Sequence, residues 1–234
     1  MMSVREFFLC LSIPLLAQSN VLENIVPADI KALRIGENVT LQAYIFYDSA
    51  FVEKTKKNSE SVGDDSDPMK KYFEDLFRKV ELAFHNESVM ISVEVEHVSQ
   101  KNDLSVYYYE GFLNEKATLE NVTAYGKSLG QPSNTIFYHF TWSKHKFIST
   151  NVKTGAISQS AVETDGTFCS QNTSAAVIGH LHGSMNREST VKATAFIFGS
   201  LHFLWFDEQD KQNMNETFLR CLNKEKIPED IPAC

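Results

Sequence analysis

The chain has few cysteines, an excess of negative charge and no long apolar run beyond its first twenty residues. Its four cysteines include no C-x-x-C pair, which argues against a thioredoxin-like centre and against a cysteine-type zinc site. A net charge of -8 argues against nucleic acid or an anionic membrane surface as a partner. No G-x-S-x-G, P-loop or G-x-G-x-x-G motif occurs, so the corresponding hydrolase and nucleotide sites find no support.

The N-terminus has the layout of a secretory signal peptide. Arg5 precedes an apolar run, 7–17, which is too short to span a bilayer and is followed by small and polar residues. We therefore expect 1–19 to be a signal peptide, 20–36 a short extension and 37–234 a single domain that is secreted and has no membrane partner. Five N-x-[ST] sequons agree with this route, at Asn38, Asn86, Asn121, Asn172 and Asn215.

Loss of the signal peptide removes Cys10 and leaves Cys169, Cys221 and Cys234. In an oxidising compartment we expect two of these to pair and one to be left over.

The first half of the domain predicts a strand, a helix and a second strand. Apolar residues alternate over 37–48, as in a strand, and a polar loop follows over 54–67. Asp67-Pro68 is a good helix start. The helix it begins has one apolar stripe, formed by Met69, Tyr72, Phe73, Leu76, Phe77, Val80 and Phe84. A half-buried strand is expected over 89–98 and a shorter one over 103–110.

The second half continues the alternation of helices and strands. We expect a helix over 117–130, with Thr118 as N-cap and Gly130 at its end. Strands are predicted over 134–142 (buried on both faces), 155–163 (at an edge) and 173–183, and helices over 194–209 and 213–223. This order indicates a single α/β domain with a mixed sheet.

The stretch TAFIFGSLHFLWFDEQ, Thr194 to Gln209, carries a resemblance to a known family. Metzincin zinc proteases have H-E-x-x-H-x-x-G-x-x-H on their active-site helix, where the histidines bind zinc and the Glu is the general base. With the first position of that motif on Phe196, Gly199 and Asp207 match residues common around it. GTFCS (166–170), RCLNKEKIP (220–228) and the strand–long helix–strand opening also match. The chain thus resembles the reprolysins, and most of all the tick salivary metalloproteases, over roughly 37–225.

In this alignment every chemical position is replaced. Phe196, Ser200 and Phe206 stand at the zinc-ligand positions, Ile197 at the general base and Phe203 at the helix-ending Gly. A phenyl ring offers no lone pair to a metal and a lone hydroxyl is a poor zinc ligand, so the resemblance implies no catalytic residue, no metal and no cofactor. Because Phe disfavours a left-handed conformation, we expect the helix to run on through Phe203.

The resemblance also implies further features. The fold would be metzincin-like, a mixed twisted sheet with long helices and a reduced C-terminal subdomain. The subdomain would be reduced because too few residues lie between Asp207 and the last helix to form the segment with the family's Met-turn, although Met214 lies nearby. It implies a Cys169–Cys221 disulfide. Cys234 would pair with another chain, remain from a lost Cys-rich tail or be free.

The expected function is that of a secreted pseudoprotease that binds an extracellular or host protein or peptide. The family holds substrate along a sheet edge, which here lies near 156–162. Two alternatives stay open. One is an active zinc endopeptidase that uses His180, His182 and His202, since H-x-H on a strand puts both rings on one face. The other is a secreted small-ligand binder, for which a barrel with more strands and fewer helices is expected.

Overall fold

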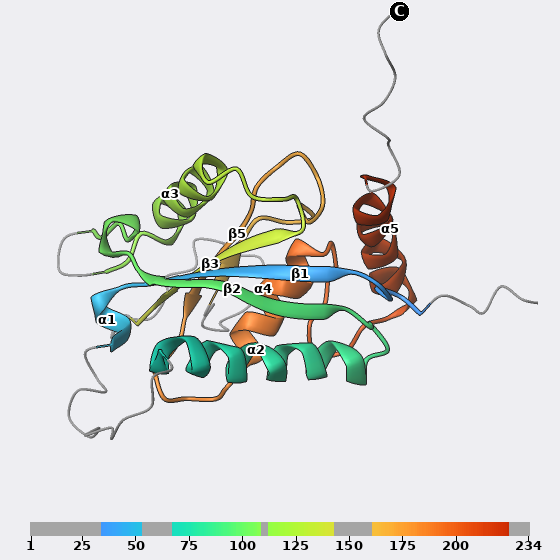
Figure 1. Ribbon diagram of the computed structural model, residues 1–234, viewed down its shortest axis with the longest axis horizontal. Coiled ribbons are helices and arrows are strands. Elements are labelled where there is room, and N and C mark those ends of the chain that lie inside the picture. The colour runs from blue at the N-terminus through green and yellow to red at the C-terminus, as the bar shows by residue number, and fades with distance from the viewer. Residues whose placement is uncertain (1–33, 53–66, 109–111, 143–160, 225–234) are drawn as a thin grey trace, which may run out of the picture. The chain divides into compact units, whose positions relative to one another are not determined.

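The computed structural model describes residues 34–52, 67–108, 112–142 and 161–224. These residues form one five-stranded sheet, in the order β2-β1-β3-β5-β4, with helices on both faces (Figure 1). The strands are β1 (Thr40–Tyr47), β2 (Ser92–Gln100), β3 (Thr135–Thr141), β4 (Ala161–Glu163) and β5 (Ser174–Gly179). The helices are α1 (Ser49–Val52), α2 (Pro68–Asn86), the 3-10 turn η1 (Asn102–Leu104), α3 (Glu115–Ser128), α4 (Glu188–Ile197) and α5 (Glu208–Lys224).

The sheet is mixed, because β1, β2, β3 and β5 run parallel and β4 alone runs antiparallel, paired with β5. The chain leaves β1 through α2 to reach β2 on one side, then returns through α3 to β3 on the other side. The order of connections therefore reverses between β1 and β3, and the carboxyl ends of these strands form the usual ligand-binding place in open α/β sheets. The predicted α/β fold with a mixed sheet is confirmed.

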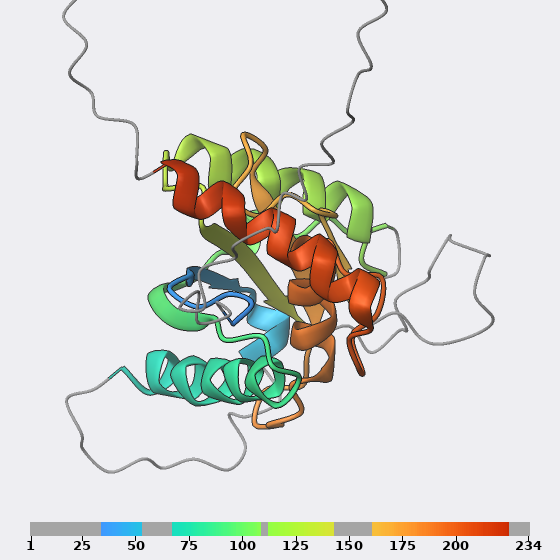
Figure 2. The same ribbon diagram turned by 90° about the vertical axis from the view of Figure 1, so that its right-hand side faces the viewer.

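Two clusters of buried apolar side chains fill the space between the sheet and its helices. The larger joins one face of the sheet to α2, α4 and α5, and the smaller joins the other face to α3. In Figure 2, α3 lies above the sheet and α2 lies below it. The α2 side chains Phe73, Leu76, Phe77, Val80 and Phe84 are all buried, as the apolar stripe predicted.

Most of the predicted elements lie where the sequence placed them. Asp67 caps α2, since its carboxylate accepts a hydrogen bond of 3.0 Å from the Met69 N–H. Every residue of β3 is buried, as expected for a strand covered on both faces. The predicted edge strand is β4 for its described part, Ala161–Glu163, while 155–160 lie outside the described residues. Gly130 follows α3 with φ of 61°, the left-handed conformation expected after a helix end.

Two local predictions were wrong. The residue that caps α3 is Asn114, whose side chain accepts from the Ala117 N–H at 3.1 Å, whereas Thr118 lies one turn inside and accepts from Val106 N. The expected strand over 103–110 is absent from its described part, which holds only η1 and an isolated bridge from Tyr107 to Leu113. That segment is held by hydroxyl contacts to Asp48 instead of a strand partner.

Several expectations fall on other parts of the chain. The signal peptide over 1–19, nearly all of the extension 20–36, the loop over 54–67 except Asp67, and Cys234 lie outside the described residues. Cys169 and Cys221 form a disulfide with a Cα–Cα distance of 5.1 Å, the pair that the resemblance implied. Among the residues that the structure describes, no helix has both the length and the apolar character needed to cross a membrane.

Candidate functional site at the end of helix α4

Helix α4 ends at Ile197, one turn earlier than the zinc-protease alignment requires. Gly199 takes φ of 91° and its N–H donates to Phe196 O at 2.9 Å, while the Ser200 N–H donates to Ala195 O at 3.0 Å. This pair of hydrogen bonds is a Schellman motif, which ends a helix at a left-handed glycine. The prediction that the helix continues through Phe203 was wrong, because Gly199 stops it before a Phe has to adopt a left-handed conformation.

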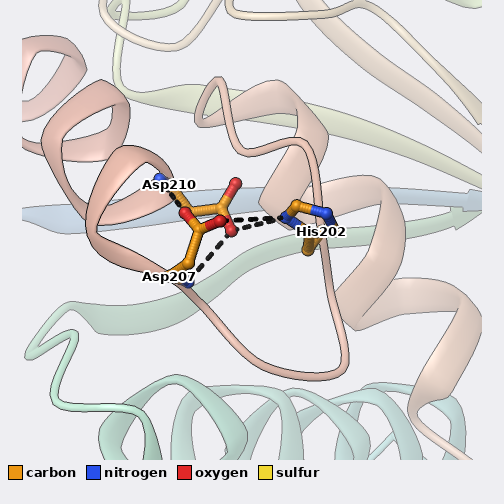
Figure 3. Close-up of side chains that lie close together, drawn as sticks. All are labelled: His202, Asp207 and Asp210. Atoms are coloured by element: carbon orange, nitrogen blue, oxygen red, sulfur yellow. Dashed lines mark hydrogen bonds and ion pairs between the residues drawn. The ribbon is translucent and has the colours of Figure 1, made fainter.

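The loop that follows, Ser200–Asp207, is held by the buried carboxylate of Asp210 at the start of α5 (Figure 3). Asp210 accepts from Leu201 N at 2.7 Å and from Asp207 N at 3.1 Å, and lies 2.8 Å from His202 Nδ1. Burial by itself raises the pKa of Asp210, but the hydrogen bonds from Leu201, His202, Asp207 and Ser200 lower it to about 2. The carboxylate is therefore ionised and fully used in fixing the loop.

The three expected zinc-ligand positions have separate surroundings. The Phe196 ring packs edge-on against Phe203, with ring centres 6.2 Å apart. Ser200 donates a hydrogen bond of 2.7 Å to the backbone oxygen of His202. Phe206 is buried and stacks on Phe84 of α2, with ring centres 5.5 Å apart. Ile197, at the general-base position, is buried in the core.

The helix end suggests a second register for the motif. The metzincin glycine ends the active-site helix and Gly199 ends α4, so the motif can also be aligned with its glycine on Gly199. This register places Lys192, Phe196 and His202 at the ligand positions and Ala193 at the general base. A protonated ammonium repels a metal cation and a phenyl ring cannot bind one. The residues do not fit zinc in this register, and the sequence-based register with Phe196, Ser200 and Phe206 fits no better.

The alternative zinc set of His180, His182 and His202 is not brought together. Both His180 and His182 pack on Phe51, with ring centres 6.2 and 5.0 Å from it. His180 Nε2 also lies 2.7 Å from the Tyr72 hydroxyl and 2.9 Å from Ser184 O. Burial lowers the pKa of both of these histidines. His202 belongs instead to a group with Asp207 and Asp210, so this prediction was wrong.

Among the described residues, His202, Asp207 and Asp210 are the one set of three metal-ligating side chains whose ligand atoms lie within 4.8 Å of one another. Its hydrogen bonds account for this proximity. Asp210 uses both oxygens on the loop, and Asp207 accepts from the Asp210 N–H at 2.8 Å as the N-cap of α5. The set is a helix and loop cap, a role that backbone N–H donors at a helix start favour.

Lys192 extends from α4 to the edge of the sheet. Its ammonium donates to Ala161 O on β4 at 3.4 Å and lies 5.5 Å above the Phe196 ring. Around it, burial raises the pKa of Glu115 and of Glu163 to about 7, and Lys192 partly opposes both shifts. The described β4 has one strand neighbour, β5, so this lysine contacts the edge at which an additional strand would pair.

A second polar cluster, absent from the sequence analysis, lies at the reversal point between β1 and β3. Asp48, the residue after β1, accepts through Oδ2 from the hydroxyls of Thr141 at 2.6 Å, Ser105 at 2.8 Å and Tyr107 at 3.0 Å. His139 Nε2 lies 2.8 Å from Ser105 Oγ. Burial lowers the pKa of His139 to about 4, against the opposing charges of Asp48 and Asp103.

This cluster does not have the geometry of a catalytic triad. A triad needs the Asp on Nδ1 of the His, and the His Nε2 free to accept the Ser proton. Here the Ser105 hydroxyl donates to Asp48, so the neutral His139 must carry its proton on Nε2. The cluster therefore ties the residue after β1 and the segment after η1 to the end of β3. The sequence signal for it was a polar residue at the end of each of two buried strands, Asp48 and Thr141.

No family model and no curated protein sequence matches the chain. Among solved structures, it is similar to metalloproteinase-II from Bacteroides fragilis, with a TM-score of 0.43 and 11% sequence identity. The match covers 79% of this chain and 54% of that one, so the chain spans about half the length of this solved structure.

Proposed function

We propose that the protein is a secreted, non-catalytic relative of the reprolysin-like metzincins that binds an extended segment of an extracellular or host protein. The observation that carries this proposal is the Schellman end of α4 at Gly199. When the motif glycine is aligned with Gly199, the three ligand positions fall on Lys192, Phe196 and His202, and of these only the His202 imidazole is an ordinary zinc ligand.

The chemistry of these residues supports loss of catalysis. A metal-activated hydrolase needs a held metal and a base that accepts a proton from its water. The base position is Ala193 when the motif glycine is placed on Gly199, and Ile197 in the sequence-based register. Neither side chain accepts a proton. The open five-stranded sheet of the described residues also argues against the barrel expected of a small-ligand binder.

The edge strand β4 supports a binding role. Thr164 N donates to Ala175 O, so Thr164 is a hydrogen-bonded position of the β4–β5 ladder. Val162, two residues earlier and paired with Val177, is the next such position. In an antiparallel pair the alternate residues turn their N–H and C=O groups away from the partner. Ala161 and Glu163 therefore turn their backbone groups to the outer edge. The Ala161 C=O there accepts from Lys192, so the N–H and C=O of Glu163 are the groups with which an extended peptide would pair as a further strand.

Proline at position 163 tests this edge directly. Glu163→Pro removes the outward N–H and should lower the affinity for an extended peptide about tenfold or more, whereas Glu163→Gln keeps that N–H and is the matched control. The probe is a pool of random-sequence peptides, with and without methylated backbone amides. Binding of the unmethylated pool alone, lost in Glu163→Pro, supports the proposal. Equal binding by both variants would refute edge pairing.

A further inference from the structure

A groove of about 370 Å³ lies where the end of α2, the start of α4 and the loop Ser200–Asp207 meet. Its lining joins the apolar side chains of Val191, Phe203 and Leu204 to polar ones from Asn86 and Arg187. A groove of this size suits a small ligand with one apolar face and several hydroxyl groups, because amide and guanidinium groups can bond the hydroxyls.

The loop beside the groove exposes three large apolar side chains. Leu201, Leu204 and Trp205 are 68%, 61% and 58% exposed, and the His202 ring stacks on Trp205 with ring centres 5.9 Å apart. Asp210 fixes the backbone on which they stand. Exposed apolar side chains that gather on one surface typically mark a place at which another group binds.

The side chain of Asn86 lies at this groove. Asn86 is the last residue of α2, it is exposed, and it lines the groove together with Phe203 and Leu204. It is also the acceptor of the sequon Asn86-Glu87-Ser88. A sugar attached here would start inside the groove, at a high effective concentration, so even weak packing would hold it in place.

We propose that Asn86 carries an N-linked glycan whose first sugars lie in this groove, against Phe203 and Leu204. The carbon-bearing face of a sugar ring would pack on the apolar side chains, and its hydroxyls would bond to the amide and guanidinium groups at the groove. The proposal rests on secretion through a glycosylating pathway. It is independent of peptide binding at β4.

The experiment compares the secreted protein with three variants. Asn86→Gln and Ser88→Asn each destroy the sequon, and asparagine suits position 88 because Ser88 has φ of 66°. Asn215→Gln removes a different exposed sequon, on α5, and is the control. Glycopeptide mass spectrometry measures occupancy, and amide hydrogen exchange measures protection of residues 200–207.

The expected result is an occupied Asn86 in the secreted protein. Both sequon variants should increase exchange over 200–207 and binding of an apolar dye several-fold, while the control changes neither. Trimming the glycan enzymatically to its first sugar should keep most of the protection. An unoccupied Asn86 would overturn the proposal. So would an occupied Asn86 whose loss leaves exchange over 200–207 unchanged, even if peptide binding at β4 succeeds.

Discussion

At the residue scale, single buried carboxylates decide where the loops lie. Asp48 accepts hydrogen bonds from the hydroxyl groups of Ser105, Tyr107 and Thr141, which lie far from it in the sequence. Asp210 accepts hydrogen bonds from backbone N–H groups of a loop that ends three residues before it. An ionised carboxylate that is buried and fully hydrogen-bonded stabilises its surroundings, and leaving its donors unpaired is costly.

Asp210→Asn should destabilise the protein by about 2–4 kcal/mol at pH 7, because an amide cannot accept all of these hydrogen bonds and loses the charge. The folded pKa of about 2 lies below the ordinary 3.8. The stabilisation by Asp210 is therefore complete above about pH 4 and is lost as the pH falls through about 2.

Urea denaturation at pH 7 and at pH 2.5 measures this difference. The difference in the free energy of unfolding between the native protein and Asp210→Asn should be smaller at pH 2.5 than at pH 7. Asp207→Asn keeps an oxygen that can accept from Asp210 N, so it is the milder control. If this difference in the free energy of unfolding is the same at both pH values, the charge of the Asp210 carboxylate is not what stabilises the protein.

At the element scale, the residue at which α4 ends is the main difference between the structure and the sequence-based expectation. Periodicity and cap chemistry predicted α2 and β3 well, because their apolar residues are local in sequence. The same cap rules end α4 at Gly199, whereas the motif alignment predicts a helix that continues through Phe203. For the Asp48 cluster the sequence signals only Asp48 and Thr141, at the ends of two strands. Its other members could not be predicted, since only the tertiary fold brings Ser105 and Tyr107 to Asp48.

Gly199→Ala should lower the free energy of unfolding by about 1 kcal/mol or more, because alanine disfavours the φ of 91° at this position. The cost is conformational, since the nearest atom to an added Cβ, Thr217 Oγ1, would be 3.5 Å away, an ordinary contact. Gly199→Asn should cost less, as asparagine tolerates this conformation. Thermal unfolding compares the two variants. Equal stability of the alanine variant and the native protein would contradict the Schellman assignment.

At the scale of the whole molecule, the disulfide joins the segment before β5 to α5. Cys169 and Cys221 are 52 residues apart, and closing that loop stabilises the folded state by about 4 kcal/mol in the loop-entropy model. The double variant Cys169→Ser, Cys221→Ser should unfold at a correspondingly lower denaturant concentration. An unchanged unfolding midpoint would show that the bridge does not constrain the unfolded chain.

The sheet and its helices also set what the molecule can do as a whole. The mixed sheet positions α4 beneath β5 and β4, so Lys192 reaches the edge carbonyl of Ala161. In the proposed alignment with the motif glycine on Gly199, Lys192 and Phe196 stand at two zinc-ligand positions and Ala193 at the general-base position, and none of these side chains is an ordinary zinc ligand or general base for such a site.

The measurement that tests this account most directly is the metal content of the secreted, folded protein, together with a general peptide-cleavage assay with and without chelator. The account predicts no stoichiometric zinc and no chelator-sensitive cleavage. One tightly bound zinc per chain, with cleavage that chelator abolishes, would contradict it and show that a metal centre forms from residues other than those at the end of α4.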